Sequence, residues 1–303
     1  MTAKGATSLW VDLLGAETRF VGTRYRTRIV EAGQGPVLLL LHGTGGHLEN
    51  YARNIMPMAE NFRVIAFDFL WHGLSQTEGF DTDIMPLLTD QVADVMDTLG
   101  IERAAIEGQS LGGWVAMQFA LRHPARVTQL VLTTTMGYAP DAGAIPGYIE
   151  PDWSANLKTS LEVLQNPSFE NVRTRMVRIL AKPSRLTDEA VRIRQALYQR
   201  PALAEVQARF IAEYLGGGLV WKDVVTDAMA RQIAAPTLTY WGAQNRTPPA
   251  LGEHIARQVQ NGQFHCAADT GHWAQFESAE EHNRVVTAFL RSGGTHVNGP
   301  MAA

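Results

Sequence analysis

The sequence is poor in cysteine: Cys266 is the only one among 303 residues. A single thiol excludes an internal disulfide and any metal cluster that needs several cysteine ligands. The residues around it, 264–268, are mostly apolar. Such a setting predicts a buried, unreactive thiol at Cys266.

Positive charge and long apolar runs are also scarce. The chain has 26 Lys and Arg against 30 Asp and Glu, a formal net charge of -4, so it lacks the basic field that attracts nucleic acid. No apolar run reaches the length of a membrane span. Residues 1–14 contain one lysine and no long apolar core, unlike a signal peptide. We therefore expect a cytoplasmic protein with neither nucleic acid nor membrane as a partner.

Alternating strand and helix patterns are abundant, and no internal repeat interrupts them. The five aliphatic residues 37–41 predict a strand buried on both faces, whereas the alternation within 20–31 predicts antiparallel strands with one wet face. Further strands are expected at 63–67, 104–106, 127–133, 236–241 and 263–266, with helices at 48–60, 84–99, 114–121, 251–259 and 274–290. This order predicts an α/β fold, a mostly parallel central sheet flanked by helices.

The alternation stops between residues 138 and 221. This stretch contains several prolines and amphipathic helical patterns but no strand pattern. It predicts a helical cap inserted into a core made of residues 1–137 and 222–291. Residues 292–303 are small and polar, which predicts a flexible tail.

The segment Gly108-Gln109-Ser110-Leu111-Gly112 is the strongest chemical motif. A G-x-S-x-G sequence between a strand and a helix is a nucleophile elbow, in which flanking glycines permit a strained turn that exposes the serine. The motif makes Ser110 the candidate nucleophile and the Leu111 N–H a donor to an oxyanion. The alternative is an ordinary glycine-rich connection between strand and helix.

A serine hydroxyl needs a base, because it is hardly ionised at neutral pH. His272 lies after the last predicted strand, so its loop is expected at the same edge of the sheet as the elbow. It is the candidate base. The turn after 37–41 offers the N–H of Thr44 as a second oxyanion donor.

Other histidines have no comparable motif. His42 begins the Thr44 turn and is interpreted as a structural residue that holds the turn in place. A zinc site formed with His47 and His72 has no support in their spacing. We predict no metal and no cofactor.

The acid of the expected triad is missing. In the loop after the strand at 236–241, where an aspartate belongs, Asn245 stands instead. An amide oxygen can accept from an imidazole but carries no charge, and in a serine protease the equivalent change costs about 10⁴ in rate. Three interpretations are open: a natural Ser-His-Asn site, a displaced acid with Asp141 as a weak candidate, or a disabled variant.

The sequence resembles the α/β-hydrolase superfamily throughout, and within it the meta-cleavage product hydrolases. The resemblance rests on Asn50-Tyr51-Ala52-Arg53-Asn54, on the elbow, and on Gly271-His272-Trp273-Ala274-Gln275-Phe276-Glu277. It implies cleavage of a C–C bond in a vinylogous diketo acid derived from aromatic compounds.

Residue roles follow from the resemblance. It implies Ser110 as nucleophile, His272 as histidine, and Arg194 as the arginine that binds the substrate carboxylate, where a planar fork of donors suits the planar anion. The substrate-binding residues it implies are Gly43, Asn50, Gln109, Arg194 and Trp273. Gln109 replaces the family's usual asparagine, and the loop after His42 is shorter than usual.

The leading hypothesis is therefore a C–C bond hydrolase. The alternatives are a carboxylesterase or lactonase acting through an acyl-serine, and a cofactor-free non-hydrolytic enzyme or ligand receptor on the same fold, since fold alone does not determine function. The expected partner is a small molecule with a carboxylate and an apolar part. An apolar cap face also predicts a homodimer.

Overall fold

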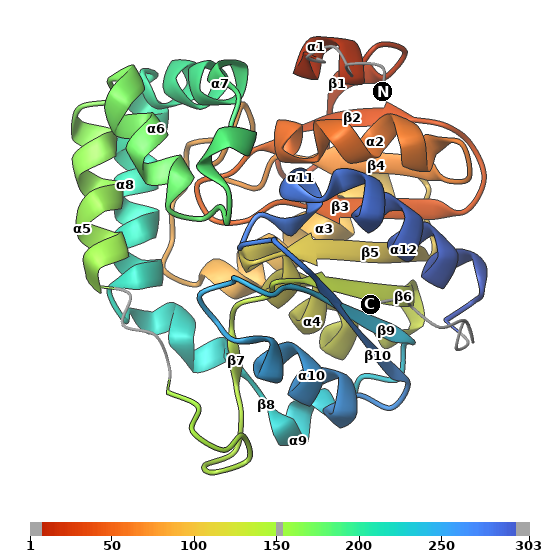
Figure 1. Cartoon of the computed structure of the whole chain (residues 1–303). Coiled ribbons are helices and arrows are strands. Elements are labelled where there is room, and N and C mark those ends of the chain that lie inside the picture. The colour runs from red at the N-terminus through yellow and green to blue at the C-terminus, as the bar shows by residue number, and fades with distance from the viewer. Residues whose placement is uncertain (1–7, 150–153, 295–303) are drawn as a thin grey trace, which may run out of the picture.

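The structure, a computed structural model, describes residues 8–149 and 154–294. Its centre is an eight-stranded sheet in the order β1-β2-β4-β3-β5-β6-β9-β10 (Figure 1). The β1-β2 and β2-β4 pairs are antiparallel and the others parallel. The strands are β1 (Glu17–Val21), β2 (Thr27–Ala32), β3 (Val37–Leu41), β4 (Arg63–Phe67), β5 (Ala104–Gln109), β6 (Val127–Thr133), β9 (Thr237–Gly242) and β10 (Gly262–Ala267).

Helices cover both faces of the sheet, as the sequence pattern predicted. One face carries α3 (Ile84–Thr98), α4 (Leu111–Arg122) and α10 (Pro249–Gln258), and the other carries α2 (Ala52–Ala59) and α12 (Ala279–Arg291). In β3, Leu39 and Leu41 join the first core, whereas Leu38 and Leu40 join the second. The aliphatic run is thus a strand buried on both faces, because successive side chains point to opposite sides.

A helical insertion, residues 138–221, separates β6 from β9. It contains α5 (Ser154–Gln165), α6 (Phe169–Val177), α7 (Asp188–Tyr198) and α8 (Pro201–Leu215), which form a separate layer at one end of the sheet (Figure 1). Two short strands, β7 (Tyr138–Ala139) and β8 (Val225–Thr226), pair where the chain leaves the core and returns.

We retain as a proposal that this insertion is a cap on a core of residues 1–137 and 222–291. Of the tail predicted at 292–303, residues 295–303 lie outside the described part of the chain.

The remaining elements are short. They are α1 (Leu9–Asp12), α9 (Asp227–Ala230), α11 (Ala274–Glu277) and the 3₁₀ turns η1 (Leu48–Tyr51), η2 (Pro124–Arg126), η3 (Pro183–Arg185) and η4 (Leu219–Asp223).

Two expectations were wrong. The single helix predicted for 274–290 is broken at Ser278, where φ is -119° and ψ 43°, so α11 ends before α12 begins. The break leaves the Glu277 carboxylate in contact with the backbone of Gly271. Cys266 is exposed rather than buried. It lies on the edge strand β10, where its neighbours His265 and Ala267 point into the protein and it therefore points out.

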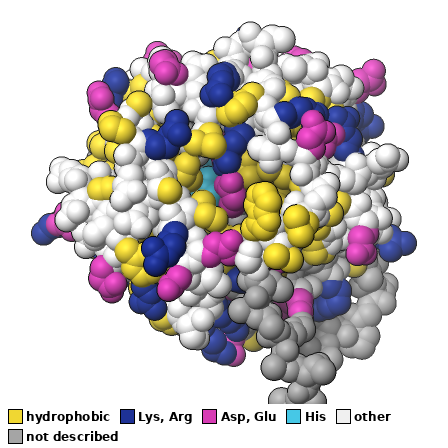
Figure 2. Space-filling view, turned by 90° about the horizontal axis from the view of Figure 1, so that it is seen from above, with side chains coloured by type: hydrophobic (Ala, Val, Ile, Leu, Met, Phe, Trp, Pro, Cys, Tyr) yellow, Lys and Arg dark blue, Asp and Glu magenta, His cyan; other side chains and the backbone are white. Residues whose placement is uncertain are grey.

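The surface has no large field of one charge on the side seen in Figure 2, where acidic and basic side chains are mixed. Large hydrophobic side chains exposed within the described residues are Trp10, Val11, Leu14, Phe20 and Ile149. No helix among the described residues has the length and apolar character needed to span a membrane.

Candidate active site

The G-x-S-x-G segment forms the tight turn that the sequence predicted, between β5 and α4. Ser110 has φ 55° and ψ -114°, a conformation that non-glycine residues rarely adopt. A Cβ on Gly112 would lie 2.1 Å from the carbonyl oxygen of Leu41, and one on Gly108 would lie 2.1 Å from that of Gly112. The two glycines therefore allow the strand, the turn and the helix to approach closely enough to hold Ser110 in place.

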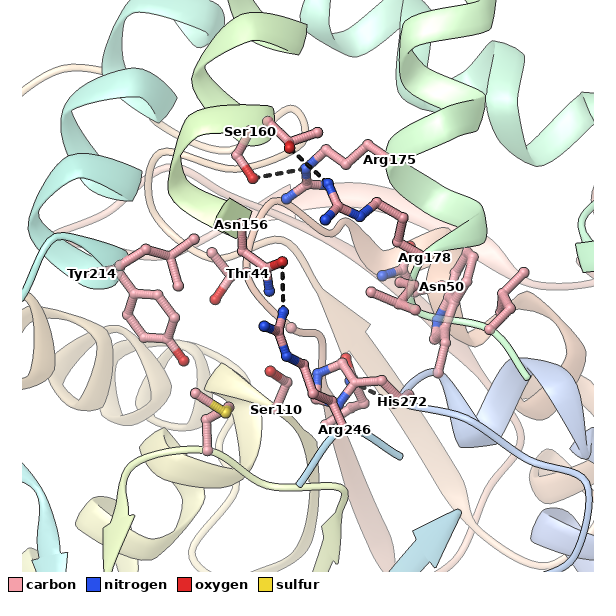
Figure 3. Close-up of a pocket in the computed structure, with 18 of the residues that line it drawn as sticks. Thr44, Asn50, Ser110, Asn156, Ser160, Arg175, Arg178, Tyr214, Arg246 and His272 are labelled. Atoms are coloured by element: carbon pink, nitrogen blue, oxygen red, sulfur yellow. Dashed lines mark hydrogen bonds between the residues drawn. The ribbon is translucent and has the colours of Figure 1, made fainter. Parts of the chain in front are cut away.

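The loop that follows β10 brings His272 to the same cavity as Ser110 (Figure 3). The Nδ1 atom of His272 lies 3.0 Å from Oδ1 of Asn245. The Asn245 amide nitrogen in turn donates to Oγ1 of Thr247 over 2.8 Å. In this arrangement Nδ1 carries the proton and Nε2 is the acceptor, which is the tautomer that a general base requires.

No carboxylate of the described residues acts on His272. Burial alone lowers its pKa to about 4, because the surrounding protein disfavours the imidazolium and no anion opposes that effect. Asp141, the candidate for a displaced acid, is mostly exposed and lies 4.0 Å from Arg231. Asn245, in contrast, is in direct contact with the His272 ring, so we keep it as the candidate for the acid position.

The backbone of His272 is fixed by side chains from neighbouring strands. Its carbonyl oxygen accepts from Nε2 of Gln109 over 3.0 Å and from Oγ1 of Thr134 over 2.7 Å. Gln109 stands where the resembling family has asparagine, and its side-chain amide contacts this loop from the end of β5. Sequence reasoning missed this role of Thr134, which follows β6 with φ 43°.

The helical insertion is tied to the same loop. The N–H of His272 donates to the carbonyl oxygen of Ile179 over 2.8 Å. The buried Glu277 carboxylate accepts from the N–H groups of Gly271 (2.7 Å) and Ala181 (2.9 Å). The sequence singles out Glu277 only as the last residue of a motif, because its partner Ala181 lies 96 residues away in the chain.

The turn after β3 lies beside Ser110. The N–H of Phe69 donates to Nε2 of His42 over 3.1 Å, so Nδ1 of His42 carries the proton and donates to the carbonyl oxygen of Gly43 over 2.8 Å. Burial lowers the pKa of His42 to about 3, so the ring is neutral. His42 therefore braces the turn that carries Thr44. Leu111, the first residue of α4, has an N–H with no acceptor inside its helix.

His47 and His72, the two histidines considered with His42 as a zinc site, make local contacts. Nδ1 of His47 lies 2.8 Å from Glu49, and Nδ1 of His72 lies 2.8 Å from the carbonyl oxygen of Leu70. Within residues 8–149 and 154–294, no group of three or more His, Cys, Asp and Glu side chains is placed to hold a metal ion.

The cavity has a volume of about 390 Å³ and lies between the sheet edge and the helical insertion (Figure 3). Several predicted site residues line it: Gly43, Thr44, Asn50, Gln109, Ser110, Arg194, His272 and Trp273. Arg194 is 4% exposed and donates from Nη2 to Oδ1 of Asn50 over 3.1 Å. Its guanidinium is therefore inside the cavity and not on the solvated face of α7.

All the charged side chains that line the cavity in the described part of the chain are arginines. Arg194 is joined there by Arg175, Arg178 and Arg246, none of which the sequence singled out. Met136, Leu180 and Leu215 contribute apolar wall. The cavity thus combines a cationic lining with an apolar part, which suits an anion with a hydrophobic portion.

Comparison with known proteins agrees with this geometry. The family described as having the alpha/beta hydrolase fold matches residues 36–279. The chain belongs to the α/β-hydrolase family. Relatives of this hydrolase include a 2-hydroxy-6-oxononadienedioate/2-hydroxy-6-oxononatrienedioate hydrolase from Paraburkholderia xenovorans strain LB400. That relative is 32% identical over 266 residues, which are 86% of this chain and 89% of the relative.

A 2-hydroxy-6-oxo-6-phenylhexa-2,4-dienoate hydrolase from Comamonas testosteroni is 31% identical over 274 residues, covering 86% of this chain and 90% of that protein. The hydrolase also shares its fold with the solved 2-hydroxy-6-oxo-6-phenylhexa-2,4-dienoate hydrolase of Rhodococcus sp. strain RHA1. There the TM-score is 0.79 at 23% identity, over 91% of this chain and 99% of that one. The protein is therefore an α/β-hydrolase enzyme whose sequence is most like meta-cleavage product hydrolases.

Proposed function

We propose that this hydrolase cleaves a C–C bond in a 2-hydroxy-6-oxo-dienoate, a meta-cleavage type of substrate. The observation that carries the proposal is the placement of Arg194 with Asn50 in the cavity that also contains Ser110 and His272. A buried guanidinium bound to a neutral amide has spare donors for a planar carboxylate. The named relatives support the same substrate class.

In the proposed reaction Arg194 holds the C1 carboxylate and places the C6 carbonyl near Ser110. Protonation of the dienol at C5, assisted by His272, moves the C2 oxygen from enol to ketone. This ketone accepts electrons in the cleavage step. When the C5–C6 bond breaks, the electron pair of that bond moves through the conjugated chain to the C2 oxygen.

Cleavage of C5–C6 follows attack on the C6 carbonyl by Ser110 or by water, with His272 taking the proton of the attacking hydroxyl. The N–H groups of Leu111 and Thr44 bind the resulting oxyanion. On the serine route a water molecule then hydrolyses the acyl-serine to a carboxylic acid. The proposed reaction uses no metal and no cofactor.

We further propose that Asn245 is a working member of a Ser-His-Asn set. Its oxygen is held toward His272 by the bond from its amide nitrogen to Thr247. Without a negative charge it orients the imidazole but does little to stabilise the imidazolium. The cost is a lower rate rather than loss of the reaction.

The test mixes two substrates, a yellow 6-phenyl dienolate and a nonadienedioate analogue, with the parent protein and with the Asn245→Asp variant. The absorbance of each dienolate is followed with time. Decay of the dienolate band with release of the carboxylic acid is the expected result. Ser110→Ala should reduce the rate by about 10³-fold or more, whereas a non-hydrolytic function leaves most activity intact in that variant. Turnover of nitrophenyl esters without turnover of any dienolate would overturn the proposal in favour of an esterase.

A further inference from the structure

Two arginines from different helices of the insertion converge above the turn after β3. Arg175 comes from α6 and Arg194 from α7, and both line the cavity. A methyl group placed on Gly45 would lie 3.1 Å from Nη2 of Arg175 and 2.7 Å from the hydroxyl of Tyr198. The guanidinium carbon of Arg194 lies 5.8 Å from the centre of the Tyr198 ring. The two cationic groups are therefore neighbours at one end of the cavity.

Neither arginine forms an ion pair with a carboxylate of the described residues, although Tyr198 and Glu49 both favour the charged form of Arg194. The ion pairs of this part of the chain include neither arginine, and Nε of Arg194 is buried without a hydrogen-bond partner. Nε of Arg175 is bound to the neutral hydroxyl of Ser160 over 3.0 Å (Figure 3). Glu49, the nearby acid, already accepts from Arg28 and His47.

The buried Arg194 and the half-buried Arg175 carry like charges that repel each other, and the repulsion is removed when an anion enters. Burial, together with the adjacent Arg175, lowers the pKa of Arg194, while Tyr198 opposes the shift. One carboxylate neutralises only one of these cations. A ligand with two adjacent negative groups neutralises both.

We propose that Arg175 and Arg194 form a clamp that binds the substrate head as a dianion, a C1 carboxylate next to a C2 enolate. Arg194, with Asn50, holds the carboxylate, and Arg175 faces the C2 oxygen. The inference rests on the proposed function and adds Arg175 as a substrate-binding residue. The 2-hydroxyl loses its proton to water on binding, and in the later ketonisation step water returns one proton to C5 with the assistance of His272. When the C5–C6 bond later breaks, the electron pair that returns to the C2 oxygen meets the same guanidinium.

The decisive experiment uses the Ser110→Ala protein, which retains the substrate, and follows the absorbance of the bound 6-phenyl dienolate against pH. In that background the Arg175→Gln change should raise the apparent enol pKa of the bound substrate by about one pH unit or more, because the enolate loses a facing cation. Arg175→Lys, which keeps the charge, should recover part of the shift. Arg173→Gln removes the same charge from the same helix outside the cavity lining and should leave the titration unchanged.

A second measurement separates the clamp from a general loss of structure. With Ser110 present, Arg175→Gln should lower kcat/KM for the dienolate by about 10-fold or more, and by a larger factor than kcat/KM for an uncharged nitrophenyl ester, whereas Arg173→Gln should leave both near the parent value. If the Arg175→Gln variant binds the dienolate normally and its bound substrate has the same apparent enol pKa as in the Arg173→Gln control, the clamp is overturned and the proposed function is not. Failure of the Ser110→Ala protein to bind any dienolate would overturn the proposed function, and the clamp with it.

Discussion

The side-chain oxygen of Asn245 lies 3.0 Å from Nδ1 of His272, in the position of the acid in a Ser-His-Asp triad. An amide oxygen can accept from Nδ1 as a carboxylate oxygen would, but it carries no charge. As a result, the imidazole is oriented correctly, but its protonated form is stabilised only by the neutral amide dipole. The distinction between orientation and charge can be measured.

Asn245→Asp should increase kcat for the dienolate by about 10²-fold or more, because a carboxylate stabilises the imidazolium formed during proton transfer. Asn245→Ala, which removes the acceptor altogether, should be slower than the parent protein. Stopped-flow decay of the dienolate band measures all three. Equal rates for Asn245→Asp and Asn245→Ala would show that this position does not act on His272.

The acid limb of kcat/KM should lie near pH 4. His272 acts as a base only when neutral, and its pKa of about 4 keeps it neutral down to that pH. Activity is therefore retained from neutral pH downward and lost as the pH falls through the pKa. In Asn245→Asp the added anion raises the pKa, so the limb should move toward neutral pH. Rates of hydrolysis of an uncharged ester between pH 3.5 and 8 measure the acid limb of the parent protein and that of Asn245→Asp. An acid limb near pH 6.5 in the parent protein would contradict the expectation.

Glu277→Gln should impair catalysis without removing a group from the cavity. The carboxylate accepts from the N–H groups of Gly271, Ala181 and Lys182, and a carboxamide would direct an NH₂ at some of them. We expect a loss of about 1–3 kcal/mol in the free energy of unfolding and a fall in kcat larger than any rise in KM. Glu253→Gln, at a surface pair with Arg257, is the control. Denaturant unfolding and steady-state kinetics measure both variants. If Glu277→Gln has the same unfolding free energy, kcat and KM as Glu253→Gln, Glu277 has no positioning role.

Gly112→Ala should destabilise the fold by about 3 kcal/mol or more, because the new methyl would lie 2.1 Å from the Leu41 carbonyl oxygen, which is main chain and cannot move aside. Gly100→Ala adds the same methyl at φ 65° with no atom within 4 Å. That control should cost only about 1–2 kcal/mol. Urea unfolding of both variants tests the comparison, and similar losses would show that close approach at the elbow is unimportant.

Much of the scaffold could be predicted from local patterns. The strands at Arg63–Phe67 and Val127–Thr133 have the predicted bounds, because each contains a short run of buried apolar residues, 64–67 in the first and 130–132 in the second. The break between α11 and α12 could not be predicted, because residues 274–290 contain no glycine or proline to mark it. Cys266 was misjudged because its neighbours are apolar, while its exposure depends on β10 being an edge strand.

For this protein the sequence by itself determined the elbow at Ser110, the base candidate His272 and the missing charge at Asn245, because these depend on residue type and on order along the chain. Only the tertiary structure decided what surrounds them. The arginines at 175, 178 and 246, the Glu277 contacts and the side-chain bridge from Gln109 join segments far apart in sequence. No local pattern records them, since charge in a cavity is set by which helices fold over it.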